Sequence, residues 1–310
     1  DQLVVGTVEE PTVAMANVGG WRHVWSKRNR VPAKWVGAFN TLLTLGSPSS
    51  GSPWIGDETI PQGSGFARVL VSSTGTARWL GKLSDGTPLA GAVPLGPNGE
   101  VRHWQTLYRN LGSVRFDGVI NDSDELDGTG DWVKLTPQSP KMRSYVDGFG
   151  TDARGPVGLI LTGGRWAVPP RGQNLLGILG IDEVSDNLLV EFSEGGIADS
   201  ATDPDVSATL DNRNRILIPP KNPATNPAGV SAKLSPATGL ITGFLQPADD
   251  NPEKPGTTLV RKTGYIGVWV PRLDRAEGSF QLPQLAVPGT TTGRTSPILS
   301  GKVVIRPIAP

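Results

Sequence analysis

The chain has 310 residues and no cysteine, and its 29 Lys and Arg residues balance 29 Asp and Glu residues. Without cysteine, disulfides, thiolate catalysis and cysteine-ligated metal sites are excluded. A zero net charge provides no long-range field to attract nucleic acid or an anionic membrane surface, so we expect no nucleic-acid partner. No apolar run approaches the roughly 18 residues that a membrane-spanning helix needs, so we expect no membrane span.

Glycine and proline are unusually frequent, with 40 and 28 residues. A composition this rich in helix breakers predicts many short strands joined by turns rather than long helices. Nine tryptophans and regularly spaced apolar runs predict a folded core rather than a disordered chain. We therefore expect an all-β protein with little helix.

Residues 1–20 are predicted to form an extended N-terminal arm or first strand. Two apolar pieces, 3–8 and 12–16, are separated by Glu9, Glu10 and Pro11, which prevent one continuous strand. The arm is then either an ordinary first strand or a segment that pairs with a neighbouring subunit. The candidate residues for self-association are Leu3, Val5, Val8 and Val13.

The stretch 21–39 interleaves tryptophans with Arg and Lys side chains. Such interleaving occurs in binding sites for single-stranded nucleic acid or sugar. We favour a packing interpretation, in which the tryptophan rings cover one end of a barrel and basic side chains stack on them.

The clearest hairpin lies at 65–87. Ala77, Trp79 and Leu83 fall on one face of its second strand, which predicts a half-buried strand with these side chains inward. Ser-Thr-Gly and Ser-Asp-Gly sequences place glycine where the turns need a positive φ.

A weaker echo of this hairpin occurs at 230–247. Turn glycine and strand glycine are six residues apart in the first hairpin (Gly75 and Gly81) and four apart in the second (Gly239 and Gly243). Because the difference is even, the inward and outward faces keep their parity. The echo predicts that the two halves of the chain are related.

Further strands follow at the spacing of an antiparallel meander, in a barrel or a sandwich. We expect 121–131 to be an acidic turn and 157–168 a strand pair turned at Gly163-Gly164. A Pro-Pro-Arg-Gly sequence at 169–172 marks the predicted domain boundary. The predicted units are an arm at 1–20, a first β domain at 21–168 and a second, related β domain at 169–310.

No catalytic constellation emerges from the residues. His23 and His103 are the two histidines, and each is flanked by Trp and Arg in a strand-like context. No nucleophile-elbow, zinc-protease or phosphate-loop pattern occurs. We therefore expect a protein that is not an enzyme and has no cofactor.

Calcium is the one ion that the sequence favours, since hard oxygen ligands suit it. Its candidate ligands lie in one glycine-containing loop: Asp122, Asp124, Asp127 and Asp131. The alternative is a solvated acidic turn. Sugar binding by exposed tryptophan is also open, with Trp54, Trp104 and Trp269 as candidates, against the alternative that these rings pack in the core.

Several short segments of the sequence resemble a β-rich module of large, mostly uncharacterised exported and surface proteins of planctomycete- and verrucomicrobium-like bacteria. In the first half these are STGTARWLGKLSDGTPL, LYRNLGSVRFDGVI and GDWVKL, and in the second half NLLVEFSEGGI, KLSPATGLITGF, GVWVP and SPILSGKVVI. The resemblance covers roughly residues 60–310 and brings no catalytic residues. It implies a location outside the cytoplasm and a structural or surface role.

These observations together predict a non-enzymatic structural subunit of an extracellular assembly, such as a filament, a sheath or a surface layer. Its partners would be copies of itself, joined by strand exchange through the N-terminal segment. The alternative is a secreted carbohydrate-binding or adhesion module that holds polysaccharide on exposed tryptophan.

Overall fold

The computed structural model describes residues 3–10, 13–48, 50–136, 139, 142–178, 185–197 and 202–308. Within these ranges the chain is nearly all β, as predicted. Helical structure there is limited to one short helix and three 3-10 turns: α1 (Leu175–Ile178), η1 (Ala33–Trp35), η2 (Tyr108–Asn110) and η3 (Pro271–Leu273). None of these described helices is long and apolar enough to cross a membrane.

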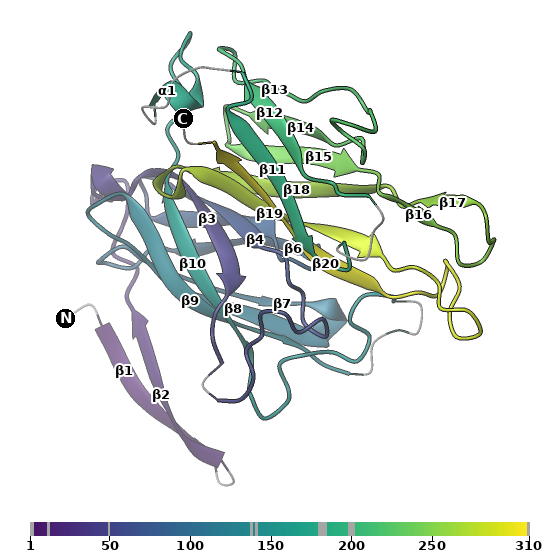
Figure 1. Ribbon diagram of the computed structural model, residues 1–310. Coiled ribbons are helices and arrows are strands. Elements are labelled where there is room, and N and C mark those ends of the chain that lie inside the picture. Colours follow the sequence, from purple (N-terminus) through teal and green to yellow (C-terminus); the bar gives the residue numbers. More distant parts are fainter. Residues whose placement is uncertain are drawn as a thin grey trace.

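The first large sheet is a nearly closed up-and-down barrel, here called the N-terminal barrel (Figure 1). Successive strands pair with one another, and the first and last, β3 and β10, pair to complete the circle. The circle is interrupted by a seam between β6 and β7, the two ends of the strand order. The strands are β3 (Gly37–Leu45), β4 (Gly65–Val71), β5 (Thr76–Lys82), β6 (Pro88–Pro94), β7 (Glu100–Thr106), β8 (Gly112–Ile120), β9 (Glu125–Lys134) and β10 (Val157–Arg165).

The second large sheet, the C-terminal barrel, has the same topology. Its first and last strands, β11 and β20, pair with each other, and its seam lies between β13 and β14. A small two-stranded sheet, β16 (Ala248–Asp250) with β17 (Thr258–Val260), is inserted between β15 and β18. The strands are β11 (Leu188–Glu194), β12 (Val206–Leu210), β13 (Ile216–Leu217), β14 (Ser231–Ser235), β15 (Leu240–Leu245), β18 (Thr263–Val270), β19 (Arg275–Pro283) and β20 (Ile298–Pro307). The predicted fold class of two related antiparallel meanders is confirmed, and each meander takes the form of a barrel.

Each barrel has its own apolar core. In β5, Ala77 and Trp79 are buried, and Leu83 is buried just beyond the strand, as the alternation predicts. Trp132 fills the other side of the N-terminal core, and Trp269 is fully buried in the C-terminal barrel. Each fully buried large apolar side chain contributes about 1.5–3 kcal/mol relative to exposure, so these interiors are packed cores rather than channels.

The echo between 65–87 and 230–247 falls on hairpins at different positions in the two barrels. The first is β4–β5, the second and third strands of its barrel, and the second is β14–β15, the fourth and fifth strands. Face parity nevertheless follows the expectation, because Ala77 and Ile241, each two residues after the turn glycine, are both buried. The echo is therefore a local similarity of two hairpins, and these hairpins do not occupy corresponding positions in the two barrels.

Two other hairpins do occupy corresponding positions in the two barrels. They are β8–β9 and β18–β19, the sixth and seventh strands of each barrel. Each contains two glycines directly opposite one another, Gly118 with Gly128 and Gly267 with Gly278. In each, an aspartate in the left-handed conformation, Asp124 or Asp274, stands four residues before the second glycine. A Cβ on Gly278 would lie 2.1 Å from the Ile266 carbonyl oxygen, so the paired strands approach too closely for any larger residue.

Two local predictions in the N-terminal barrel were wrong. The acidic stretch 121–131 is a turn only as far as Asp124, and β9 begins at Glu125. The stretch 157–168 is not a hairpin, because Gly163-Gly164 lie inside the single strand β10. A Cβ on Gly163 would lie 2.6 Å from that of Thr41, so this glycine serves the close pairing of β10 with β3 that completes the barrel.

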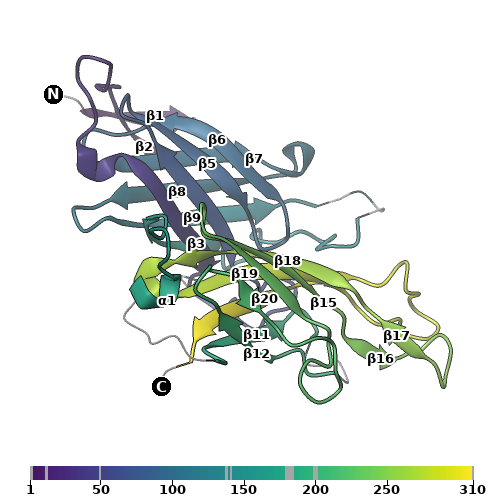
Figure 2. The ribbon, with the colours of Figure 1, turned by 90° about the horizontal axis from the view of Figure 1, so that it is seen from above.

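The two barrels pack side by side through the outer face of β3 and β4 (Figures 1 and 2). Leu42 and Phe66 contact Val268 and Val270 of β18 in a small apolar cluster. Beside it, the buried Asn40 side chain donates hydrogen bonds from Nδ2 to the carbonyl oxygens of two C-terminal-barrel residues, Thr238 and Trp269, both at 3.0 Å.

A buried carboxylate forms the polar centre of the same interface. Glu277 on β19 accepts a hydrogen bond from the Ser64 hydroxyl of the N-terminal barrel at 2.7 Å, and pairs with Lys302 at 3.1 Å and Arg275 at 2.6 Å. Burial alone would raise the pKa of Glu277, but Lys302, the Ser64 hydroxyl and Arg275 outweigh burial and hold the pKa below its ordinary value. The group therefore stays ionised and joins the two barrels.

The N-terminal residues form a separate hairpin, β1 (Leu3–Glu10) with β2 (Val13–Trp21). It is its own two-stranded sheet and belongs to neither barrel. In both ribbon views it lies beside the N-terminal barrel, on the side away from the C-terminal barrel (Figures 1 and 2). Glu9 and Glu10, where a break was predicted, are instead the last residues of β1, and Pro11 lies outside the described residues.

Candidate functional site

The seam of the N-terminal barrel, between β6 and β7, lies at a strand edge whose sequence disfavours further strand pairing. β6 has proline at both ends, Pro88 and Pro94, and proline cannot donate to a strand ladder. In place of a ladder, the Gln105 side chain of β7 bridges the seam. Its Oε1 accepts from the Ala90 amide at 3.1 Å and its Nε2 donates to the Pro88 carbonyl oxygen at 3.1 Å.

A stack of three aromatic rings lies just inside the seam. Trp79 stacks with Phe116 and with His103, each at a centroid distance of 5.3 Å. His103 is only 4% exposed, and a Cβ on Gly91 of β6 would lie 2.3 Å from its Cε1 atom. The glycine therefore makes room for the imidazole between β6 and β7.

His103 is neutral near pH 7, because burial lowers its pKa below the ordinary value of 6.5 despite the contact with Gln105. One imidazole nitrogen is then a hydrogen-bond acceptor and the other a donor. Among the described residues, no group forms a hydrogen bond with its buried Nδ1.

The outer face of the seam carries one exposed indole among paired charges. Trp104 is 63% exposed, and its strand partner is Arg115. One step along the ladder, Arg102 pairs with Asp117 through an ion pair of 3.0 Å. Arg115 in turn forms an ion pair with Asp131 on β9.

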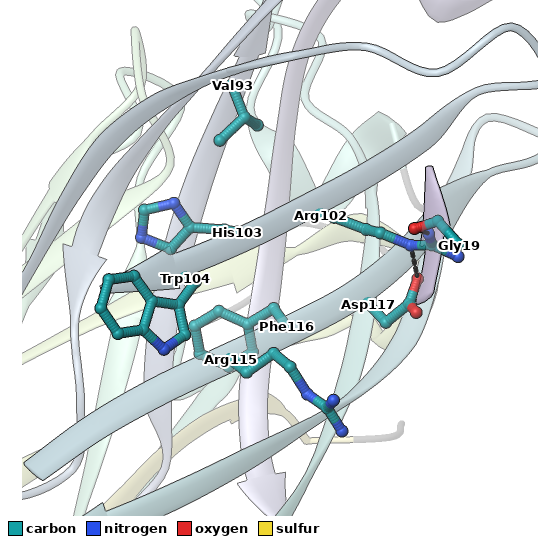
Figure 3. Close-up of a pocket in the computed structure, with 8 residues that line it drawn as sticks. All are labelled: Gly19, Val93, Arg102, His103, Trp104, Arg115, Phe116 and Asp117. Carbon is teal, nitrogen blue, oxygen red and sulfur yellow. Dashed lines mark hydrogen bonds and ion pairs between the residues drawn. The ribbon is translucent and has the colours of Figure 1, made fainter. Parts of the chain in front are cut away.

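These side chains line a pocket of ≈ 620 Å³, here called the Trp104 pocket (Figure 3). Its volume is within the range of small-molecule binding sites. The close-up shows the Arg102–Asp117 pair beside Gly19 of the hairpin, with Trp104 further along β7. Its lining residues are Gly19, Val93, Arg102, His103, Trp104, Arg115, Phe116 and Asp117.

The N-terminal hairpin meets the Trp104 pocket at Arg102. The guanidinium lies over the Trp21 ring at 4.7 Å and donates to the Gly19 carbonyl oxygen at 3.4 Å. Of the predicted self-association residues, Leu3, Val5 and Val8 lie on β1 and Val13 lies on β2. The Val5 side chain is 81% exposed.

The four candidate calcium ligands are separated and individually paired. Each aspartate forms an ion pair with a different basic side chain: Asp122 with Lys34, Asp124 with Arg165, Asp127 with Arg272 and Asp131 with Arg115. Because β9 is extended, Asp127 and Asp131 are about 13 Å apart along it. Within the described ranges, no three His, Asp or Glu side chains come together as metal ligands would.

Of the three tryptophans considered for sugar binding, two are buried and one is exposed. Trp54 and Trp269 are buried, so they cannot bind sugar on a surface, whereas Trp104 is exposed. In 21–39 the packing interpretation is confirmed at one barrel end: Trp25 packs edge-on to Trp35 at 6.1 Å and donates from Nε1 to the Gly96 carbonyl oxygen at 3.1 Å.

The charged partners of Trp104 were missed by sequence reasoning. Alternation in VRHWQT and VRFDGV places Arg102, Trp104, Arg115 and Asp117 on outward faces. It does not show which outward residues face each other, because that depends on the register between β7 and β8.

The fold defines a tandem pair of nearly closed, eight-stranded up-and-down barrels, and a pocket lies at each of the two seams. Comparisons with protein-family models, with curated proteins and with solved structures find no match to this chain.

Proposed function

We propose that this chain is a non-enzymatic structural subunit of an extracellular assembly, and that the β1–β2 hairpin joins one copy to the next. The observation that carries the proposal is the hairpin itself, which forms a sheet of its own beside the barrels (Figure 1). An isolated two-stranded hairpin is marginally stable in water, so such a ribbon gains stability when another sheet or surface covers it.

The described polar and ring contacts between hairpin and barrel come from the Arg102 side chain alone. The exposed Val5 side chain gives the hairpin an apolar position directed at solvent. Strand edges with apolar side chains recruit further strands through main-chain hydrogen bonds. A zero net charge lowers the repulsion that would keep copies apart.

The placement of the hairpin favours an open polymer over a closed dimer. It lies on the N-terminal barrel, on the side away from the C-terminal barrel, in both ribbon views (Figures 1 and 2). A donor segment at one end of a molecule and an acceptor elsewhere on its neighbour make a head-to-tail contact, which repeats without closing. The proposed extracellular location rests on the resemblance of short sequence segments to modules of exported bacterial proteins.

The non-enzymatic part of the proposal rests on how the buried titratable groups are used. Asp249 and Arg261 pair with each other, and Glu277 pairs with Lys302 and Arg275. His103 is enclosed by aromatic rings. These groups hold structure together, and the described contacts give none of them a nucleophile to activate.

Electron microscopy of the purified full chain tests the proposal. Wild type is expected to form long, regular polymers, and Val5→Lys is expected to abolish them because a charge would then be buried at each junction. Val287→Lys is the matched control, since Val287 is also an exposed valine, at 55%, but lies far along the chain after β19.

Deletion of residues 1–16 should have the same effect as Val5→Lys. A monodisperse monomer in wild type would exclude the structural role. Polymers that persist in Val5→Lys and in the deletion would exclude the hairpin as the joint.

A further inference from the structure

We propose that the Trp104 pocket binds a neutral saccharide, with the Trp104 indole as the stacking platform. The stacking platform of this site differs from the proposed assembly joint, because Trp104 lies on β7 of the barrel, although Gly19 of the hairpin lines one end of the pocket. The proposal rests on an exposed indole and on a local balance of charge in the same pocket.

Trp104 offers a flat apolar face to solvent. At 63% exposure it is the most exposed of the tryptophans whose side chains the structure describes, while Trp79, Trp132 and Trp269 are fully buried. The C–H face of a sugar ring is the natural complement of an exposed indole, because it is apolar while its edge carries hydroxyls. Val93, across the seam on β6, extends the apolar wall.

The charges around the indole favour a neutral ligand over an anionic one. Arg102 is paired with Asp117, and Arg115 is paired with Asp131. Each guanidinium near the indole is thus neutralised by a carboxylate, so the site gives a phosphate or sulfate chain no net attraction. The same groups present planar hydrogen-bond donors and acceptors at the pocket wall, which the hydroxyls of a sugar ring can use.

Affinity electrophoresis and fluorescence titration of the full chain test this site. The probes are cellohexaose, mannohexaose and xylohexaose, with heparin and an oligothymidylate as anionic comparisons. At least one neutral hexasaccharide is expected to bind and to change the tryptophan fluorescence. Trp104→Ala should weaken that binding about tenfold or more, which is the loss of one stacking contact.

Leu80→Ala is the matched control, since Leu80 is an exposed apolar residue, at 47%, on β5 of the same barrel. It should bind as wild type does. Both variants should keep the wild-type circular dichroism, because both side chains are exposed. Neither should alter polymer formation, which separates this test from that of the assembly.

Three results would overturn the proposal. The first is no binding of any neutral hexasaccharide, and the second is binding that Trp104→Ala leaves unchanged. The third is binding of heparin or the oligothymidylate in preference to the neutral probes, which would assign the pocket to a polyanion.

Discussion

The buried ion pair between Asp249 and Arg261 gives the sharpest test of the energetics of the C-terminal barrel. It joins β16 to the chain just after β17, and its side chains are 2% and 4% exposed. The Arg261 Nε donates to the Asp249 carboxylate at 2.7 Å, and an Nη donates to the Pro283 carbonyl oxygen at 3.0 Å. We expect Arg261→Met to be strongly destabilising.

The magnitude follows from the burial. Two unit charges 2.7 Å apart attract by about 6 kcal/mol at an effective dielectric constant of about 20, most of which offsets their desolvation. Arg261→Met removes the guanidinium that faces this buried carboxylate, so the expected loss in the free energy of unfolding is about 3–5 kcal/mol. Replacing both residues, with Asp249→Leu added, should recover a large part of that loss.

The matched control lies in the same barrel. Arg306 binds the Glu191 carboxylate through two nitrogens, at 2.6 and 3.1 Å, but these side chains are 45% and 33% exposed. Arg306→Met should therefore cost only about 0–1 kcal/mol. Equilibrium urea unfolding, followed by tryptophan fluorescence, measures all variants. If Arg261→Met and Arg306→Met cost the same, burial does not determine the strength of these pairs.

Two further predictions concern β19. Gly278→Ala should destabilise the C-terminal barrel by about 1–3 kcal/mol or more in urea unfolding, because its Cβ would overlap the Ile266 carbonyl oxygen. Gly264→Ala should be much milder, because a Cβ there would lie 3.6 Å from the Gly243 carbonyl oxygen, and equal effects would contradict the close approach. Glu277 has a folded pKa below its ordinary 4.5, so the unfolded state binds more protons there, and its stabilisation is lost as the pH falls from about 4.5 through the folded pKa. Glu277→Gln should flatten the pH dependence of stability in that window, and an unchanged slope would show that other carboxylates carry it.

Period-2 alternation was sufficient to predict the fold class and the inward side chains of the best-formed strands. Trp79 is an example, since Thr76, Arg78 and Lys82 on the opposite face of the strand indicate which face is exposed. The method failed at β3, where GAFNTLLTL is buried on both faces in its middle. Its outer face lies against the other barrel, so alternation disappears, and no local pattern marks the strand.

Glycine was the residue whose role was hardest to assign from sequence. Gly163 suggested a turn, yet it lies within a strand at a close approach to Thr41. The facing glycines of β8–β9 and β18–β19 are a feature that both barrels share, but they can be recognised as pairs only once the strand register is known. In the same way, the exposure of Trp104 could be proposed from its place in a strand, whereas the pairing of its neighbours Arg102 and Arg115 could not.

Closure of each barrel by its first and last strands also fixes when each core can be completed during synthesis. β3 must wait for β10, more than a hundred residues later, and β11 must wait for β20 at the very end of the described chain. Such distant pairing folds slowly and leaves strand edges open in the meantime. A nascent chain that stops short of β20 would present both β11 and β19 as unpaired edges, so synthesis of β20 decides whether the second barrel closes.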